Sequence, residues 1–263
     1  MNHSLEQHKN SNTKSVNKTL AILSTFSENT PMQRTSDIAA KLDLSVSTVS
    51  RHLNTMLDWG VLERDEDTGF YYPGLQIVAL AGAALQNNEV YRQSAPEVQE
   101  LSYRYSVHGH VGVPRGTQLV HLISSSCENT FNLHIPMGHC HPLYCSAMGR
   151  AVLAFMPPGN VHSILKNSTL KKLTPETKTE PEEIMQELRK IRKTGYCILV
   201  NELNEGKGSI AAPIFDRNRN PVAAISVSTS ERSLAQTERV KELTKAVMRA
   251  SRIISGKLGY FPS

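Results

Sequence analysis

Residues 45–72 are SVSTVSRHLNTMLDWGVLERDEDTGFYY, and this stretch decides the fold of the N-terminal part of the chain. Ser45 is a favoured helix N-cap, and apolar residues follow it at helical spacing as far as Gly60, a common helix stop. Two strand-like runs then flank residues 67–69, Asp-Thr-Gly, which is a hairpin signal. The stretch therefore predicts a helix followed by a β-hairpin. The stripe expected to be buried on this helix is Val46, Val49, Leu53, Met56 and Leu57.

Two further helices are expected upstream. Residues 15–26 (SVNKTLAILSTF) place apolar side chains on one helix face, and Thr35 is the expected N-cap of a second, short helix. Two short helices with a tight turn between them, followed by a hairpin, form a winged helix-turn-helix. We predict this domain over residues 14–74. Residues 1–13 are polar and lack periodicity, which predicts a disordered arm.

The open face of the third helix is predicted to contact double-stranded operator DNA. Arg51 can form paired hydrogen bonds with guanine or phosphate, and hydroxyls near a helix N-terminus suit phosphate or base contacts. Residues 1–73 hold seven Lys/Arg and nine Asp/Glu, so the prediction depends on the motif and not on charge. The alternative is a solvated face on a winged helix that binds other proteins. The predicted DNA-contacting residues are Thr35, Ser45, Ser47, Thr48, Arg51 and His52.

The composition is that of an ordinary soluble protein, with 39% hydrophobic and 20% charged residues among 263. No apolar run approaches the roughly 20 residues that span a bilayer, and the start has no signal-peptide h-region. Four cysteines are too few for a disulfide framework and suit a reducing compartment. We therefore expect a cytoplasmic protein with no membrane partner. The net charge of +5 favours an anionic partner, although the positive excess lies in the C-terminal part.

The rest of the chain predicts a linker and a second domain. Residues 75–90 are rich in Ala and Leu and lack Pro, so we expect a linker helix whose apolar surface needs a partner, either the second domain or another subunit. Strands are expected near 110–114, 118–124, 131–135, 196–200, 209–215 and 221–229, with helices at 146–155, 182–193 and 231–257. This order predicts an α+β domain with an antiparallel sheet over residues 91–263.

Three segments carry a resemblance to a known family. SVSTVSRHLNTMLDWGVLERD, PLYCSAMGRAVLAFMP and GYCILVNELNEGKGSIAAPIFDRNRNPVAAISVS are similar to the IclR family of bacterial transcription regulators, over roughly residues 15–257. The most specific parts are Ala147–Ala151 and Ile210–Asp216. The resemblance implies a GAF-like effector domain and a homodimer, often a dimer of dimers. It also implies an effector that is a small organic acid or an aromatic or sugar-derived catabolite, with control of a catabolic operon.

The resemblance also implies where the effector binds: at backbone donors of one turn and at side chains on the strands. Family members that bind short keto acids usually carry Asp where this chain has Leu199 and Cys where it has Ser209. The absence of this Asp and this Cys from the chain favours a larger or less charged effector. Ser226 and Ser228 alternate along a strand and so share one face, which meets either a pocket or solvent. The predicted effector-binding residues are Met148, Gly149, Leu199, Ser209, Ser226 and Ser228.

Residues 138–145, GHCHPLYC, give the strongest hint of metal or thiol chemistry. In an extended segment His139 and His141 face one way and Cys140 the other, and no paired C-x-x-C or H-x3-H spacing is present. A catalytic cysteine would also need a positioned base. We therefore predict no metal, no cofactor and no enzyme activity. The alternatives are a small-molecule enzyme fused to a winged helix and a metal-responsive regulator, because six histidines crowd together: His108, His110, His121, His134, His139 and His141.

Overall fold

The computed structural model describes residues 13–126 and 135–261, and the chain divides into two compact units between Asn87 and Asn88. Within the described ranges, no helix combines the length and the apolar character that crossing a membrane requires. The predictions made for residues 1–12 of the arm at 1–13, for most of the strand at 131–135 and for His134 lie outside these ranges.

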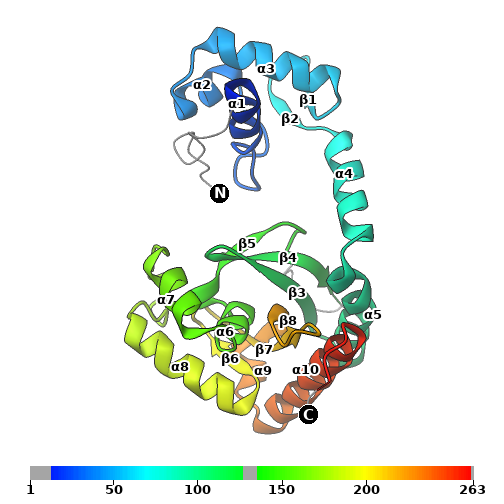
Figure 1. Cartoon of the computed structure of the whole chain (residues 1–263), viewed down its shortest axis with the longest axis vertical. Helices are drawn as coiled ribbons and strands as arrows, with labels where there is room; N and C mark the ends of the chain where they lie inside the picture. The colour runs from blue at the N-terminus through cyan, green and yellow to red at the C-terminus, as the bar shows by residue number, and fades with distance from the viewer. Residues whose placement is uncertain (1–12, 127–134, 262–263) are drawn as a thin grey trace. The chain divides into compact units, whose positions relative to one another are not determined.

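The N-terminal unit has three helices packed together, then a hairpin and a further helix (Figure 1). Its elements are α1 (Lys14–Leu23), α2 (Thr35–Leu42), α3 (Val46–Asp58), β1 (Leu62–Arg64), β2 (Tyr71–Pro73) and α4 (Leu75–Gln86). The two strands pair antiparallel, with Glu63 opposite Tyr72. This order confirms the predicted winged helix-turn-helix. Its core consists of Ile22, Ile38, Ala39, Val49, Leu53, Met56, Leu62 and Tyr71.

Local hydrogen bonds and backbone conformation determine where these helices begin and end, and one predicted helix start differs by one residue. Ser45 caps α3 as predicted, because its hydroxyl accepts the N–H of Thr48 at 3.2 Å. Gly60 follows the helix with a φ of +66°, in the region that favours glycine. The predicted cap of α2 was wrong by one residue: Arg34 is the N-cap and Thr35 begins the helix. The reason is Asp37, whose carboxylate accepts the N–H of Arg34 at 3.3 Å.

The C-terminal unit is the predicted α+β domain. Its elements are α5 (Glu89–Tyr105), β3 (His108–Arg115), β4 (Gln118–Ser125), β5 (Cys140–Pro142), a 3-10 turn (Leu143–Cys145), α6 (Ala147–Leu153), α7 (Pro158–Lys166), α8 (Pro181–Thr194), β6 (Cys197–Val200), β7 (Lys207–Phe215), β8 (Pro221–Ser230), α9 (Glu231–Leu234) and α10 (Thr237–Lys257). The six strands form one antiparallel sheet in the order β5-β4-β3-β8-β7-β6.

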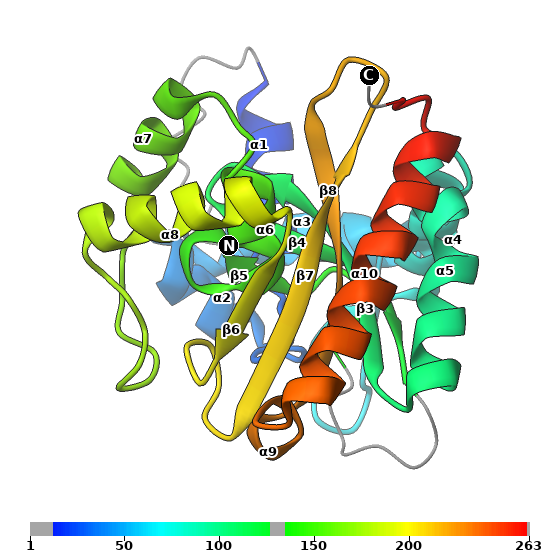
Figure 2. The same cartoon turned by 90° about the horizontal axis from the view of Figure 1, so that it is seen from below.

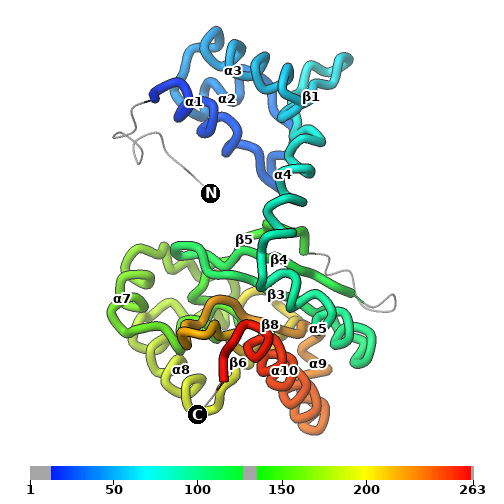
Figure 3. The backbone as a smooth tube through the Cα atoms, turned by 45° about the vertical axis from the view of Figure 1, so that its right-hand side comes forward, coloured from blue at the N-terminus to red at the C-terminus, as the bar shows by residue number. Residues whose placement is uncertain are grey.

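The two faces of this sheet are covered by different helices. Figure 2 shows α5 and α10 side by side, away from α6 and α8, and Figure 3 shows the same pairing of α5 with α10. Ile210, Ile225 and Val227 belong to the core that contains the residues of α5 and α10. Leu199 and Ala211 belong to the core that contains α6 and α8. We call the side that carries Leu199 and Ala211 the α6 face.

Several boundaries differ from the expectation. The linker helix expected at 75–90 ends at Gln86, and a new helix, α5, begins at Glu89. Pro157 and Pro158 do not only end the preceding helix; they are the N-cap and first residue of α7, where the missing N–H of proline leaves no helical hydrogen bond unmade. The single helix expected at 231–257 is two helices, because Gln236 adopts an extended conformation (φ −87°, ψ 108°) between α9 and α10.

Candidate DNA-binding surface and effector site

The exposed face of α3 carries Ser47, Arg51, Asn54 and Thr55. Ser47, Arg51 and Thr55 are spaced four residues apart, so they form one row along the helix. The prediction missed Asn54, although its place three residues after Arg51 indicates the same face. Val46, expected in the buried stripe, is 56% exposed, so this stripe begins one turn into the helix.

The first turn of α3 is held by hydroxyl groups. The Oγ of Ser45 lies 2.8 Å from the Oγ1 of Thr48 and 3.2 Å from the Oγ of Ser47, in addition to capping the helix. Ser45 therefore fixes the geometry of the helix start, which sets the direction of the exposed row.

The predicted place of His52 on the open face was wrong. Its side chain is only 7% exposed, and its Nδ1 lies 2.9 Å from the Oγ1 of Thr19 on α1. Burial, and then the charges of Arg51 and Lys18, lower the pKa of His52, so the ring is neutral at pH 7. The signal was present in the sequence, because His52 follows Val49 by three residues and so falls within the buried stripe.

The β1–β2 hairpin, which is the wing, carries four acidic residues: Glu63, Asp65, Glu66 and Asp67. Two of them form hydrogen bonds that stabilise this part of the domain. The carboxylate of Asp65 accepts the N–H of Thr68 at 2.7 Å and its hydroxyl at 2.8 Å, and these bonds lower the pKa of Asp65. The carboxylate of Glu63 accepts the N–H of Leu75 at 3.3 Å, which connects the wing to the start of α4.

A small cavity of about 60 Å³ lies on the α6 face, and three of the predicted effector residues line it: Leu199, Ser209 and Ser228. Strand pairing brings them together, since Ser209 lies opposite Leu199 on one side and opposite Ser228 on the other. The two hydroxyl oxygens are 2.8 Å apart. Lys207 lines the same cavity and was not predicted. Its spacing of two residues from Ser209 was the available signal.

The other three predicted residues do not line this cavity. Ser226 is 2% exposed and lies opposite Ala211 and His110 in the sheet, which rules out for it the alternative of a solvent-facing side chain. Met148 is 5% exposed within the core of the α6 face.

Gly149 has a packing role in α6. Its N–H donates to the Oγ of Ser146 at 3.1 Å, so it offers no free N–H to a ligand in this conformation. A Cβ at this position would lie 2.2 Å from the carbonyl oxygen of Leu143. Only glycine therefore permits this approach of the helix to the preceding turn.

A buried ion pair holds one wall of the cavity. The guanidinium of Arg150 donates to both carboxylate oxygens of Glu202, at 2.8 and 2.5 Å, and its Nε donates to the carbonyl of Tyr144 at 2.6 Å. The backbone N–H of Lys178 donates to the same carboxylate at 3.2 Å. Arg150 is fully buried and Glu202 lines the cavity. The pair thus joins α6 to the segment between β6 and β7.

Strands β3, β4 and β5 bring five of the crowded histidines together. The ring of His139, the residue before β5, and the ring of His141 have centroids 4.4 Å apart, so both lie on one side of the segment as predicted, and the ring centroids of His121 and His141 are 5.0 Å apart. Burial lowers the pKa of His110 to about 3 and that of His121 to about 2, so both rings are neutral at pH 7. In residues 13–126 and 135–261, no three His, Cys, Asp or Glu side chains are arranged to hold a metal ion.

The buried thiols are unreactive. Cys145 lines the cavity, but burial raises the pKa of Cys145 to about 12, and it does the same for Cys197. A thiol with such a pKa is protonated at pH 7 and is a poor nucleophile.

Known proteins match both units. The family model described as the IclR helix-turn-helix domain matches residues 15–66, and the one described as the C-terminal part of the bacterial transcriptional regulator IclR matches residues 82–256. The glycerol operon regulatory protein of Streptomyces coelicolor is 32% identical over 227 residues, which cover 85% of this chain and 88% of that protein.

Solved structures share the fold. The IclR of Thermotoga maritima has a TM-score of 0.75 at 28% identity, over 94% of this chain and 99% of that one. An IclR homologue from Microbacterium hydrocarbonoxydans, solved in complex with 4-hydroxybenzoate, has a TM-score of 0.81 at 23% identity, over 93% and 98%. The chain therefore belongs to the IclR family of bacterial transcriptional regulators, which bind DNA through the helix-turn-helix and a small-molecule effector through the C-terminal domain.

Proposed function

We propose that this regulator binds its operator as a homodimer through α3, and that a small organic acid on the α6 face controls the binding. The observation that carries the proposal is the presence, in one chain, of an exposed polar row on α3 and a cavity with a cation and paired hydroxyls. The DNA-binding part is residues 14–74, the linker 75–90 and the effector domain 91–263. Its place of action is the bacterial cytoplasm, at a catabolic operon.

Arg51 is the residue proposed to read a base edge. It lies on the exposed face of α3, in the N-terminal half of the helix, which is the part that meets base edges in helix-turn-helix proteins. Ser47 and Thr48, in the first turn, are placed for phosphate contacts.

Arg51→Ala should weaken operator binding by about 1–3 kcal/mol, because a paired hydrogen bond to guanine is lost. The operator is first selected from randomised DNA with the wild-type protein, and affinities are then measured by fluorescence anisotropy. Arg51→Lys is the matched control, since lysine keeps the positive charge but lacks the planar guanidinium that forms paired hydrogen bonds. Unchanged affinity of the alanine variant for the operator would contradict the assignment.

The lining of the cavity favours an anionic group. Lys207 is a cation at the cavity, whereas Glu202 already has both carboxylate oxygens bound by Arg150. Lys207 thus reverses the expectation of a larger or less charged effector, and Leu199 adds no carboxylate that would repel an acid. The hydroxyls of Ser209 and Ser228 add a donor and an acceptor.

The effector must widen the cavity to enter it. A volume of about 60 Å³ is well below the roughly 300 Å³ at which small-molecule sites begin. The effector therefore binds a different arrangement of the α6 face better than this one, and such a preference is what allows a ligand to change DNA affinity.

Lys207→Met should weaken binding of a carboxylate effector roughly 10- to 100-fold, the loss expected for one charge-assisted hydrogen bond. Small carboxylic acids and their amides are first screened by thermal shift, and each hit is titrated calorimetrically. Lys245→Met, an exposed site on α10, is the control. Amides that bind as tightly as the acids would refute the anionic class.

The homodimer is proposed from the surface of α4. None of its residues is buried, and Leu75, Val78 and Leu80 are 77%, 64% and 57% exposed. An apolar helix with no buried residue in one chain is covered favourably by another subunit.

A further inference from the structure

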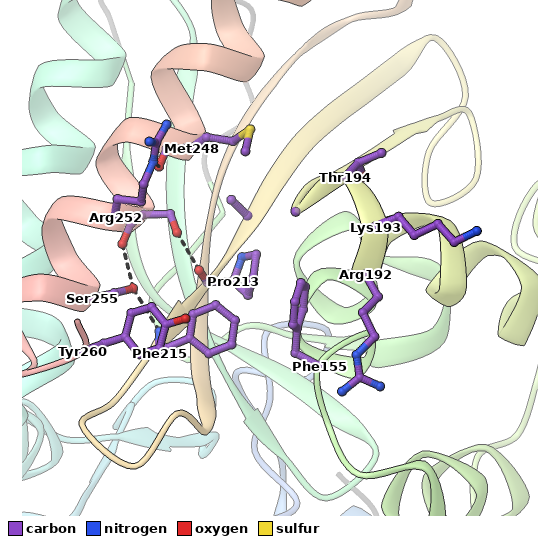
Figure 4. Close-up of a pocket in the computed structure, with 13 residues that line it drawn as sticks. Phe155, Arg192, Lys193, Thr194, Pro213, Phe215, Met248, Arg252, Ser255 and Tyr260 are labelled. Atoms are coloured by element: carbon purple, nitrogen blue, oxygen red, sulfur yellow. Dashed lines mark hydrogen bonds between the residues drawn. The ribbon is translucent and has the colours of Figure 1, made fainter. Parts of the chain in front are cut away.

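A second cavity, of about 380 Å³, lies in the C-terminal unit apart from the effector cavity, and the two share no lining residue (Figure 4). It lies beyond the first residue of β6, because Cys197 pairs with Ala211, the last residue of β7 that pairs with β6, so 212–215 form an open edge of the sheet. The end of α8 and the second half of α10 form its other walls. Its volume is in the range of small-molecule sites.

Aromatic rings form one side of this cavity. Phe155 meets Phe215 edge to face, with centroids 5.2 Å apart, and Tyr260 stacks on Phe215 at 4.9 Å (Figure 4). Pro213 and Met248 complete the apolar lining. A flat ring gains both buried area and favourable ring geometry against such a wall.

The polar groups at the floor of the cavity are already paired. The hydroxyl of Ser251 donates to the carbonyl of Pro213 at 2.5 Å, and the hydroxyl of Ser255 accepts the N–H of Phe215 at 3.0 Å. Figure 4 shows both bonds. These two hydrogen bonds pair backbone groups of β7 that have no neighbouring strand at the open edge. Hydrogen bonds to a ligand must therefore come from the rim and not from the floor.

The rim is cationic. Arg192, Lys193 and Arg252 line the cavity, and no acidic side chain does. None of these three cations takes part in the ion pairs found among residues 13–126 and 135–261. All three are exposed, so their side chains can turn toward an anion at modest entropic cost.

We propose that this cavity is a second ligand site and that it binds a small aromatic carboxylate. The ring packs against Phe155, Phe215 and Tyr260, and the carboxylate pairs with Arg192 or Arg252. An apolar ring wall beside guanidinium groups that form no ion pair within the described residues matches this class of ligand in both shape and charge.

Benzoate is the probe, and methionine methyl groups report its place of binding. The methyl carbon of Met248 lies at the cavity wall, 3.4 Å from where a Cβ on Gly195 would stand. Met148 does not line the effector cavity, but it follows Ala147, which does, and its methyl group in the core of the α6 face reports on that cavity. The full chain is labelled with ¹³C-methyl methionine, Met248 is assigned through Met248→Leu, and benzoate is titrated. We expect a saturable shift of the Met248 signal, with a Kd on the order of 1 mM for so small a ligand.

Matched compounds and variants separate the contribution of the aromatic ring to binding from that of the carboxylate charge. Benzamide, and the double variant Arg192→Gln/Arg252→Gln, should each bind about tenfold more weakly, whereas Arg249→Gln on the exposed side of α10 should leave the Kd unchanged. Cyclohexanecarboxylate should bind several-fold more weakly than benzoate.

Three results would overturn the proposal. The first is a titration in which benzoate moves Met148 and leaves Met248 unmoved, which places the ligand in the effector cavity alone. The second is equal affinity for cyclohexanecarboxylate. The third is a Met248 signal that shifts when the protein is diluted without benzoate, which identifies a second copy of the chain as the occupant.

Discussion

Replacing Glu202 with glutamine should lower the free energy of unfolding of the C-terminal unit by about 3–5 kcal/mol, because it leaves a buried guanidinium without its counter-charge. Arg150 is fully buried, and its guanidinium donates its hydrogen bonds to this partner and to the carbonyl of Tyr144. The change is measured by urea unfolding of the full chain, with far-UV circular dichroism as the signal.

Two further variants make this result specific. Glu187→Gln removes a partner of Lys178 and Lys190 at the surface and should cost no more than about 1 kcal/mol. Replacing both buried partners, as Arg150→Met with Glu202→Leu, should recover much of the loss, since no unpaired charge is then buried. A single Glu202→Gln variant as stable as the wild type would show that this ion pair does not hold the cavity wall.

Leu80→Asp should reduce dimerisation by about 100-fold or more and abolish operator binding at concentrations where the wild type is bound. Two carboxylates, one from each α4, would be desolvated in an apolar contact that is symmetric in a homodimer. Leu80 is 57% exposed in the single chain, so the substitution leaves the fold of each unit intact. Analytical ultracentrifugation and fluorescence anisotropy give the two affinities.

The control is Gln86→Asp, which places the same charge at an exposed polar position at the end of α4. It should leave both dimerisation and DNA binding near their wild-type values. Effector binding by Leu80→Asp, followed by calorimetry, should also be preserved. A Leu80→Asp protein that stays dimeric and still binds its operator would refute α4 as the contact between subunits.

The order of elements was largely predictable because it depends on local signals. The cap at Ser45, the stop at Gly60 and the alternation of Ser226 with Ser228 each act within a few residues of the chain. The boundaries that were wrong, at Thr35 and Gln236, depend on competition between neighbouring turns. Such competition is decided by small energy differences that a residue pattern does not express.

The site was predictable only where residues are close in the sequence or where the family resemblance placed them. Ser209 and Ser228 were identified together through that resemblance, and their contact then follows from the pairing of β7 with β8. His52 was assigned to the open face from its chemistry, although the helical spacing placed it inside. Spacing is the more reliable guide there, since a neutral histidine is readily buried once its ring nitrogen has a partner such as Thr19.

The sequence by itself therefore determined a winged helix-turn-helix, a linker helix and an antiparallel α+β domain, because helix periodicity, caps and strand alternation are local properties. Only the tertiary structure decided that Arg150 meets Glu202, 52 residues away, and that Lys207 lines the same cavity as Glu202. It also revealed the second cavity at the open edge of β7. Contacts between distant segments depend on how the sheet and helices pack, and the spacing of residues along the sequence does not determine that packing.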